Sequence, residues 1–139
     1  MERLYFKIIK STLSQVSESV VSIIEILKNI TEDEKILADI EIALTEALTN
    51  IVKHGYKYDE NRNIEINVFK NKNEIVMELI DYSQKINIDF NKKLDYDITD
   101  TDSLPEGGMG IYLMKTCMTS LNLKRVDNKN ILTMIKLYE

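Results

Sequence analysis

The segment TEDEKILADIEIALTEALTNIVKHG, residues 31–55, has the pattern of one long amphipathic helix. Thr31 with Glu34 three residues later forms a capping-box pattern, which predicts where the helix begins. Gly55 is placed to end it as the residue after the C-cap. Between these ends, apolar residues recur at helical spacing and predict a wide buried face: Ile36, Leu37, Ile40, Ala43, Leu44, Ala47, Leu48 and Ile51.

A polar stripe follows one edge of this apolar face. Glu46, Asn50 and His54 are each four residues apart, so their side chains lie on the same side of the helix. Burying such groups without partners would cost about 1–3 kcal/mol each. The stripe therefore either lies at a solvated margin of the core, which is the more common case, or borders a site that supplies partners.

The segments on either side of the helix predict a sheet. Strands are expected where β-branched and aromatic residues cluster or alternate with polar ones, at residues 4–10, 63–70, 74–81, 122–126 and 131–138. A helix is expected at residues 11–29, and a third one after the glycines near residue 108. Short polar turns join the strands in pairs as hairpins. We therefore predict one α+β domain over residues 1–139, a two-layer α/β sandwich with a mostly antiparallel sheet and helices on one face.

Composition narrows the class of protein. A chain of 139 residues with 44% hydrophobic residues is the size of one globular domain, and its net charge of −5 argues against a nucleic-acid surface. We expect a soluble, cytoplasmic protein, because no signal peptide is visible at the start and no apolar run approaches the ~18 residues of a membrane span. The single cysteine, Cys117, excludes an internal disulfide and is expected to be a small core residue.

Two features near the third helix point to a ligand. Residues 84–106 are acidic and have no clean period, which is typical either of a functional lid or of a surface loop with a short helix. The next segment, PEGGMG at residues 105–110, contains three of the four glycines and the only proline of the chain. Glycines that open a helix let its first free N–H groups approach an anion, although such a turn is a weak signal by itself.

Four features now follow one another along the chain: the acid–amide–imidazole helix, Asp81 at a strand end, the acidic segment and the glycine turn. Together they resemble the ATP-binding domain shared by gyrase, the heat-shock-90 chaperone, histidine kinases and MutL, the GHKL superfamily. The chain is most similar to its small stand-alone branch, the anti-sigma-factor serine/threonine kinases of bacterial partner switching. TEALTNIVKHGY (45–56) resembles the N-box, GGMGIYLMKTCM (107–118) the second glycine box, and NILTMIKL (130–137) the closing strand.

The resemblance implies roles for the N-box residues. Asn50 matches the residue that binds Mg²⁺, which bridges the nucleotide phosphates, and an amide oxygen is a suitable hard ligand. Glu46 matches the acid expected to act as general base toward the attacking hydroxyl or water. Lys53 and His54 match positions close to the phosphates, although a lysine here is also compatible with a solvated surface position.

It also implies roles for residues outside this helix. Asp81 matches the carboxylate that accepts a hydrogen bond from the adenine amino group. Thr133 matches a threonine that supports adenine recognition beside it. The turn Gly108-Met109-Gly110 matches the backbone that meets the phosphates, and residues 84–106 match the ATP lid.

One departure concerns the first glycine box. The family usually has Asp-x-Gly, whereas this chain has Asp81-Tyr82-Ser83. A Cβ at that position could crowd the base or stiffen the hinge of the lid. The departure bears on ATP affinity more than on the fold.

The resemblance implies an ATP- and Mg²⁺-dependent serine/threonine kinase that phosphorylates a small antagonist protein, binds a sigma factor and forms a possible homodimer through its first strand and helix. An alternative, favoured by Ser83 and the short acidic lid, is a nucleotide-gated partner-binding module with little or no kinase activity. A third interpretation, the ATPase half of a split histidine kinase, needs a phosphoacceptor histidine on a dimerisation helix. The only histidine, His54, lies in the expected nucleotide site, so this interpretation is the least favoured.

Overall fold

One antiparallel sheet of five strands, in the order β1-β2-β3-β5-β4, forms the base of the computed structural model, which describes residues 1–84 and 108–139. The strands are β1 (Glu2–Lys10), β2 (Asn63–Lys70), β3 (Glu74–Asp81), β4 (Ser120–Val126) and β5 (Lys129–Leu137). The helices are α1 (Leu13–Leu27), α2 (Glu34–Asn50) and α3 (Gly108–Cys117).

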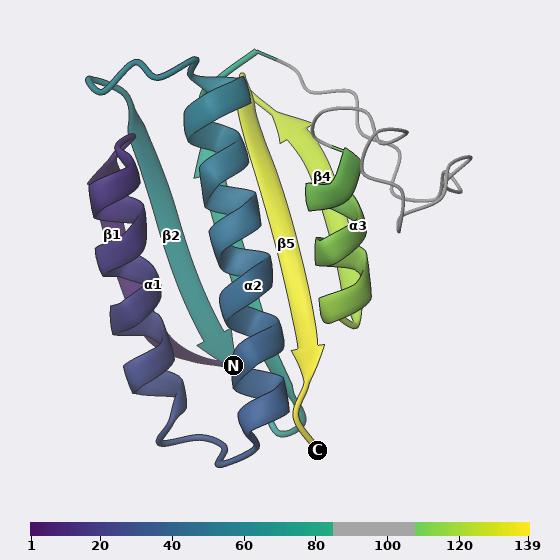
Figure 1. Ribbon diagram of the computed structural model, residues 1–139. Coiled ribbons are helices and arrows are strands. Elements are labelled where there is room, and N and C mark those ends of the chain that lie inside the picture. Colours follow the sequence, from purple (N-terminus) through teal and green to yellow (C-terminus); the bar gives the residue numbers. More distant parts are fainter. Residues whose placement is uncertain (85–107) are drawn as a thin grey trace.

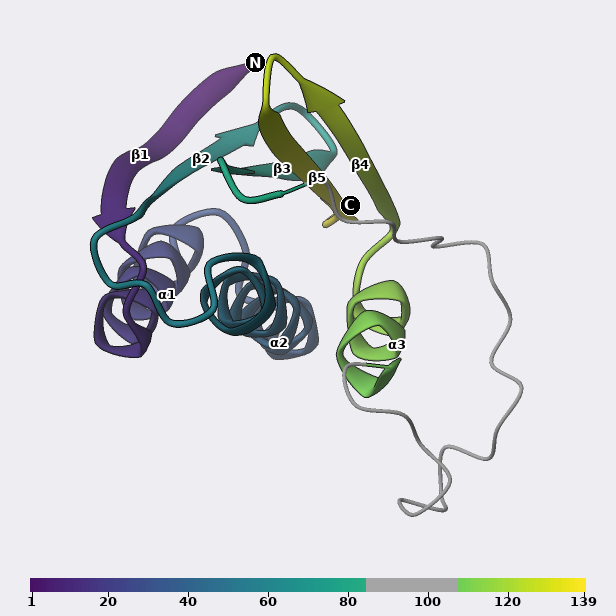
Figure 2. The same ribbon diagram turned by 90° about the horizontal axis from the view of Figure 1, so that it is seen from above.

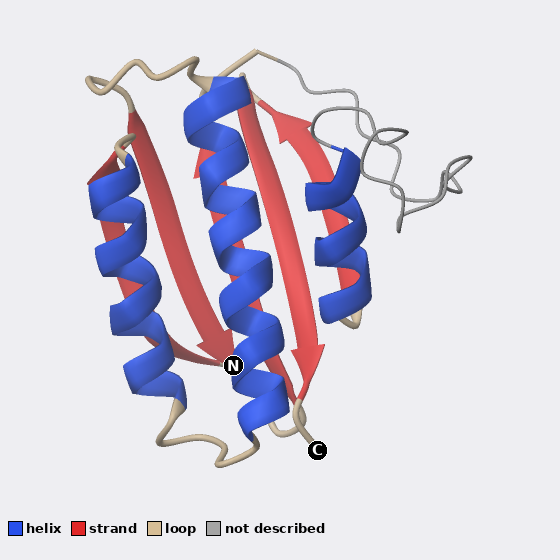
Figure 3. Ribbon diagram, viewed as in Figure 1, coloured by secondary structure: helices blue, strands red, loops and turns tan. Residues whose placement is uncertain are grey.

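All three helices cover the same face of the sheet, as Figures 1 and 2 show. The hydrophobic core lies between the two layers and is built from fully buried side chains of both: Ile23, Leu27, Ile40, Leu44, Leu48, Ile64, Ile66, Ile75, Met77, Leu79 and Met134. Figure 3 shows the helices in one layer and the strands in the other. The predicted α+β two-layer sandwich is therefore confirmed.

The start of α2 differs from the expectation. Asp33, not Thr31, is the N-cap, and its carboxylate accepts hydrogen bonds from the backbone N–H groups of Lys35 and Ile36. The Thr31 hydroxyl instead accepts from the Asp33 N–H at 3.1 Å, and Glu34 is the first helical residue. Two residues with good capping side chains lie two positions apart, and the second one takes the cap.

The end of this helix also differs from the expectation. Residues Ile51–Gly55 form a π-helical turn, closed by a hydrogen bond of 2.8 Å from the Tyr56 N–H to the Ile51 carbonyl. Gly55 is the last residue of this turn, and its backbone is not in the left-handed region that defines a glycine C′ residue. Turns of this kind inside helices are frequent at functional sites.

The strand bounds follow the sequence pattern closely. β2 and β3 span residues 63–70 and 74–81 as expected: apolar and polar residues alternate over 64–68, residues 75–80 are mostly apolar, and a polar turn separates the two segments. β4 and β5 are slightly longer than predicted and are joined by Asp127 and Asn128, whose φ angles of 50° and 66° match the type I′ hairpin turn. Asp81 at the end of β3 lies opposite Asn130 on β5.

Several expectations fall on residues outside the described part of the chain, namely the lid at 85–106 and the first residues of the PEGGMG turn. Cys117 is buried at the end of α3, as expected. Within residues 1–84 and 108–139, no helix is long and apolar enough to cross a membrane.

Candidate functional site

Two members of the polar stripe on α2 face the first turn of α3. A Cβ atom placed on Gly110 would lie 2.9 Å from Oε2 of Glu46, 3.5 Å from Nδ2 of Asn50 and 3.8 Å from its Oδ1. Gly110 is buried, and any side chain there would press on the carboxylate and the amide. The absence of a side chain therefore lets the backbone of the glycine turn approach both polar groups.

The side chains of Glu46 and Asn50 are half-buried. Among the described residues, neither side chain takes part in a hydrogen bond or an ion pair. No group of three or more acidic, histidine or cysteine side chains in the described ranges could hold a metal ion. The side chain of Asn50 offers an amide oxygen, a hard ligand that Mg²⁺ accepts together with phosphate oxygens and water.

A buried polar network surrounds Asp81, which is 3% exposed. Its Oδ1 accepts hydrogen bonds from the Ser83 N–H at 2.9 Å, from the Ser83 hydroxyl at 2.5 Å and from Nδ2 of Asn130 at 3.0 Å. Asn130 also contacts the Ser83 and Gln84 carbonyls, and Arg125 donates to Oδ1 of Asn130 at 2.9 Å. The network thus holds the Asp81 carboxylate through one of its two oxygens.

A small pocket of about 380 Å³ lies between the end of α2 and the residues after β3. It is lined by His54, Gly55, Tyr56, Lys57, Arg62, Tyr82, Ser83 and Gln84. The Tyr56 hydroxyl donates to the Asn63 carbonyl and accepts from the Tyr82 N–H, both at 2.7 Å. Burial raises the pKa of Tyr56, so its hydroxyl stays protonated and keeps the end of α2 tied to the chain after Asp81.

Lys53 lies in the π-helical turn that follows α2 and belongs to a different stripe of side chains. It lines a groove between α1 and α2 together with Thr45 and Thr49, which precede it at intervals of four residues. Glu46 and Asn50 are each one position further along the helix and face α3 instead. The structure therefore brings Glu46, Asn50 and Gly110 together and places Lys53 on the side of α2 that faces α1.

Thr133 does not lie beside Asp81, so this expectation is wrong. In the register of β3 and β5 Thr133 is opposite Glu78, whereas Asn130 is opposite Asp81. Side chains alternate between the faces of a strand, and Asn130 and Met134 face the helices, so Thr133 faces the other side of the sheet. Asn130 takes the place that the resemblance assigned to the threonine.

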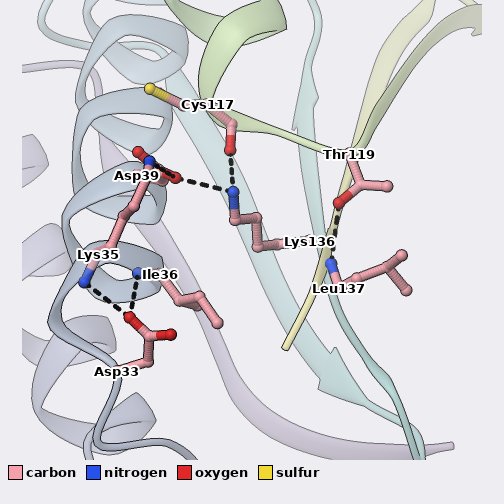
Figure 4. A network of polar contacts seen from close by, with 8 residues as sticks. All are labelled: Asp33, Lys35, Ile36, Asp39, Cys117, Thr119, Lys136 and Leu137. Carbon is pink, nitrogen blue, oxygen red and sulfur yellow. Dashed lines mark hydrogen bonds and ion pairs between the residues drawn. The ribbon is translucent and has the colours of Figure 1, made fainter. Parts of the chain in front are cut away.

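A second polar cluster fixes α3 from its other end (Figure 4). Nζ of Lys136 on β5 lies 2.9 Å from Oδ2 of Asp39 on α2 and donates to the carbonyl of Cys117, the last residue of α3. Burial alone would raise the pKa of Asp39, but hydrogen bonds from Lys136 and Lys35 outweigh it and lower the pKa below its usual range. Burial also raises the pKa of Cys117, which keeps its thiol neutral.

Sequence reasoning missed Asn130 and Arg125. The pairing of these two residues could be predicted from the turn at Asp127 and Asn128. This turn sets the β4–β5 register, in which Arg125 lies opposite Asn130. The pairing of Asn130 with Asp81 needs in addition the register between two strands that are 49 residues apart. That second register has no signal in a single sequence.

Comparison with known proteins shows which family the chain is similar to. Residues 9–136 match the model of the histidine kinase-like ATPase domain family. The chain is 34% identical over 127 residues to the serine-protein kinase RsbW of Bacillus subtilis, covering 86% of this chain and 71% of the relative. It is 37% identical over 106 residues to RsbW of Bacillus licheniformis, covering 72% of this chain and 64% of the relative.

A solved structure is also similar. The crystal structure of the RsbU and RsbW domains of a Mycobacterium tuberculosis protein superposes with a TM-score of 0.68 at 17% identity. The match covers 96% of this chain and 31% of the longer mycobacterial chain, and at this identity it supports the fold. With the family match over residues 9–136, it follows that the chain belongs to the family of histidine kinase-like ATPase domains, in which its relatives include the RsbW serine-protein kinases.

Proposed function

We propose that this protein binds Mg-ATP and transfers the γ-phosphoryl group to a serine or threonine of a small antagonist protein, and that it acts as an anti-sigma factor. The observation that carries the proposal is the contact of Gly110 with Glu46 and Asn50. It places an acid and an amide against the glycine-opened end of a helix, where backbone N–H groups favour phosphate. The serine-protein kinase relatives support serine or threonine as the acceptor.

In this proposal each polar residue has one task. Asn50 supplies an amide oxygen to Mg²⁺, which neutralises the charge of the phosphates. Glu46 accepts the proton of the attacking serine or threonine hydroxyl, while the oxygen of that hydroxyl forms a bond to the γ-phosphorus. The bond from that phosphorus to the β–γ bridging oxygen breaks, and ADP leaves with the electron pair. Asp81 accepts a hydrogen bond from the amino group of adenine.

The first experiment is calorimetric titration of Mg-ATP into the purified protein, with Mg-GTP as control. Micromolar binding of ATP without binding of GTP is expected from the acceptor role of Asp81. A protein that binds neither nucleotide would contradict the proposal.

The second experiment separates a kinase from a binding module. Transfer of ³²P from γ-labelled ATP to candidate antagonist proteins of the same genome is measured for the wild type and for Glu46→Gln. The variant is expected to bind ATP normally and to lose at least about 100-fold in transfer rate, the usual contribution of a general base. Equal rates would remove Glu46 from the mechanism.

A nucleotide-gated binding module is the second candidate, and Ser83 favours it because a side chain replaces the usual glycine beside the base. Both candidates predict ATP binding. The module predicts that ATP changes the affinity for a partner protein while no labelled phosphate is transferred, and the same two assays therefore distinguish them.

We also propose a homodimer through β1 on the uncovered face of the sheet. Phe6 and Ile8 are 48% and 54% exposed there, opposite Asn67 and Glu65 of β2. Two exposed apolar side chains side by side on this face support an interface there. Sedimentation of the wild type and of Phe6→Ser/Ile8→Ser tests it: the dimer is expected only for the wild type, and a monomeric wild type would contradict it.

A further inference from the structure

We propose that Asn130, oriented by Arg125, is a positioning residue that sets the base specificity of the site by fixing the Asp81 carboxylate. The inference rests on the proposed function and adds to it two residues from the β4–β5 hairpin. Neither residue is expected to touch the base. Their effect is expected in the discrimination between bases rather than in binding strength alone.

The direction of the hydrogen bonds follows from the chemistry of the groups. An arginine side chain can only donate, so the atom of Asn130 that lies 2.9 Å from Nη1 of Arg125 must be its carbonyl oxygen. The amide nitrogen of Asn130 therefore faces Asp81, at 3.0 Å from Oδ1. Without Arg125, Oδ1 of Asn130 would lose this donor, and its amide nitrogen would be held only by the Asp81 carboxylate and the carbonyls of Ser83 and Gln84.

The consequence for Asp81 is a carboxylate with a fixed orientation. Three donors converge on Oδ1, and none of the donors in the described ranges uses Oδ2. Asp81 and Asn130 are 3% and 2% exposed, so water does not compensate for a mismatch. Oδ2 is thereby presented as an acceptor to whichever group a nucleotide places there.

Such an acceptor distinguishes a 6-amino purine from a 6-oxo purine. The amino group of adenine donates to the carboxylate, whereas the carbonyl oxygen of hypoxanthine or guanine would face it with a second acceptor. A site built around a buried hydrogen-bonding group rejects the mismatched ligand because its own group is left unpaired. If the carboxylate could turn away from the base, part of this rejection would be lost, because no acceptor would then be held against the 6-oxo group.

The test compares the dissociation constants of Mg-ATP and Mg-ITP, whose bases carry an amino and an oxo group at C6, by calorimetry. The wild type is expected to favour ATP by about 100-fold or more. Asn130→Leu removes the donor at similar volume and is expected to lower this ratio by about tenfold, the equivalent of one hydrogen bond. Arg125→Met, which keeps the apolar stem of an exposed side chain, is expected to lower it in the same direction.

Two controls frame the result. Lys124→Met changes the neighbouring residue of β4, which has no described contact with Asp81, and should leave the ratio unchanged. Asp81→Asn should remove most of the preference for ATP. Far-ultraviolet circular dichroism and thermal unfolding establish that each variant is folded.

Two outcomes would overturn the inference in different ways. If Asn130→Leu and Arg125→Met weaken ATP and ITP by the same factor, both residues are merely structural, while the proposed function stands. If the wild type binds ATP and ITP equally, Asp81 does not read the base and the inference fails with that role. A wild type that binds neither nucleotide instead contradicts the proposed function itself.

Discussion

The hydroxymethyl group of Ser83 fills the space beside Gly55. A Cβ atom placed on Gly55 would lie 3.0 Å from Oγ of Ser83 and 3.3 Å from its Cβ. The Ser83 hydroxyl also donates to Asp81, so the serine that replaces the usual glycine packs against the π-helical turn after α2 and is hydrogen-bonded to the carboxylate that we propose reads the base. The side chain of Ser83 therefore leaves no room for a side chain at residue 55.

This relationship predicts the behaviour of a pair of variants. Gly55→Ala is expected to lower the free energy of unfolding by about 1–2 kcal/mol, because the added methyl group overpacks the contact with Ser83. In a Ser83→Gly background the same change should cost little, since the space is then open. Urea unfolding of the two single variants and the double variant measures this coupling. If Gly55→Ala lowers the free energy of unfolding equally in both backgrounds, Ser83 is not the residue that prevents a side chain at residue 55.

Substitution of Gly110, unlike that of Gly55, is expected to affect activity more than stability. The nearest atom to an added Cβ is the terminal oxygen of Glu46, which can move aside, and alanine is the better helix former by about 1 kcal/mol. Gly110→Ala should therefore fold with unchanged or slightly raised stability. Displacing Glu46 by about 1 Å should still lower phosphoryl transfer about 100-fold. Thr116→Ala, an exposed change on the same helix, is the matched control, and full activity of Gly110→Ala would contradict the close approach.

Substitution of Asn50 distinguishes a role in Mg-ATP binding from a purely structural role. Its side chain is half-buried and has no hydrogen-bond partner among the described residues, so Asn50→Ala should change the free energy of unfolding by less than about 1 kcal/mol. Binding of Mg-ATP should be abolished in calorimetry, because the cation loses its protein ligand. Thr49→Ala, one position earlier on the stripe facing α1, should bind normally. A variant of Asn50 that unfolds would show that Asn50 has a structural role instead.

The predictions from sequence are accurate where one strong local pattern acts alone. β2 coincides with an alternating segment and β3 with a mostly apolar one, and a polar turn lies between them. The start of α2 is wrong by a few residues, because Thr31 and Asp33 are both good caps and only the fold decides between them. Local patterns thus give the elements and leave the choice between equivalent caps open.

The site itself is partly accessible to sequence reasoning. Helical spacing, which is local, predicts that Glu46 and Asn50 lie on the same side of the helix, and the resemblance to the GHKL superfamily singles them out as site residues. The contact with Gly110 depends on how α3 packs on α2, and the neighbour of Asp81 depends on the register of β3 with β5. The prediction that Thr133 lies beside Asp81 is wrong for that reason. Thr133 is three residues from Asn130, and an odd number of residues along a strand moves a side chain to the other face.

The ion pair of Asp39 and Lys136 leads to a prediction about pH. Both side chains are about 15% exposed, and the pair joins α2 to β5 while Lys136 also holds the end of α3. The pKa of Asp39 is lower in the folded protein than its ordinary value, so the unfolded chain binds the proton more readily. Asp39 therefore contributes stability above the unfolded pKa of about 4, and this contribution is lost as the pH falls through the lowered folded pKa.

Lys136→Met should remove the larger of the two hydrogen bonds that lower this pKa, leaving burial to act against the charged form. At pH 7 the variant is expected to lose on the order of 2 kcal/mol, because a partly buried carboxylate loses its main partner. Between pH 5 and pH 3 its free energy of unfolding should fall less steeply than that of the wild type. Urea unfolding at pH 7, 5, 4 and 3 measures both effects. Lys35→Met removes the exposed partner of the same carboxylate and should cost less than about 1 kcal/mol. Parallel pH profiles of Lys136→Met and the wild type would show that Lys136 does not set the pKa of Asp39.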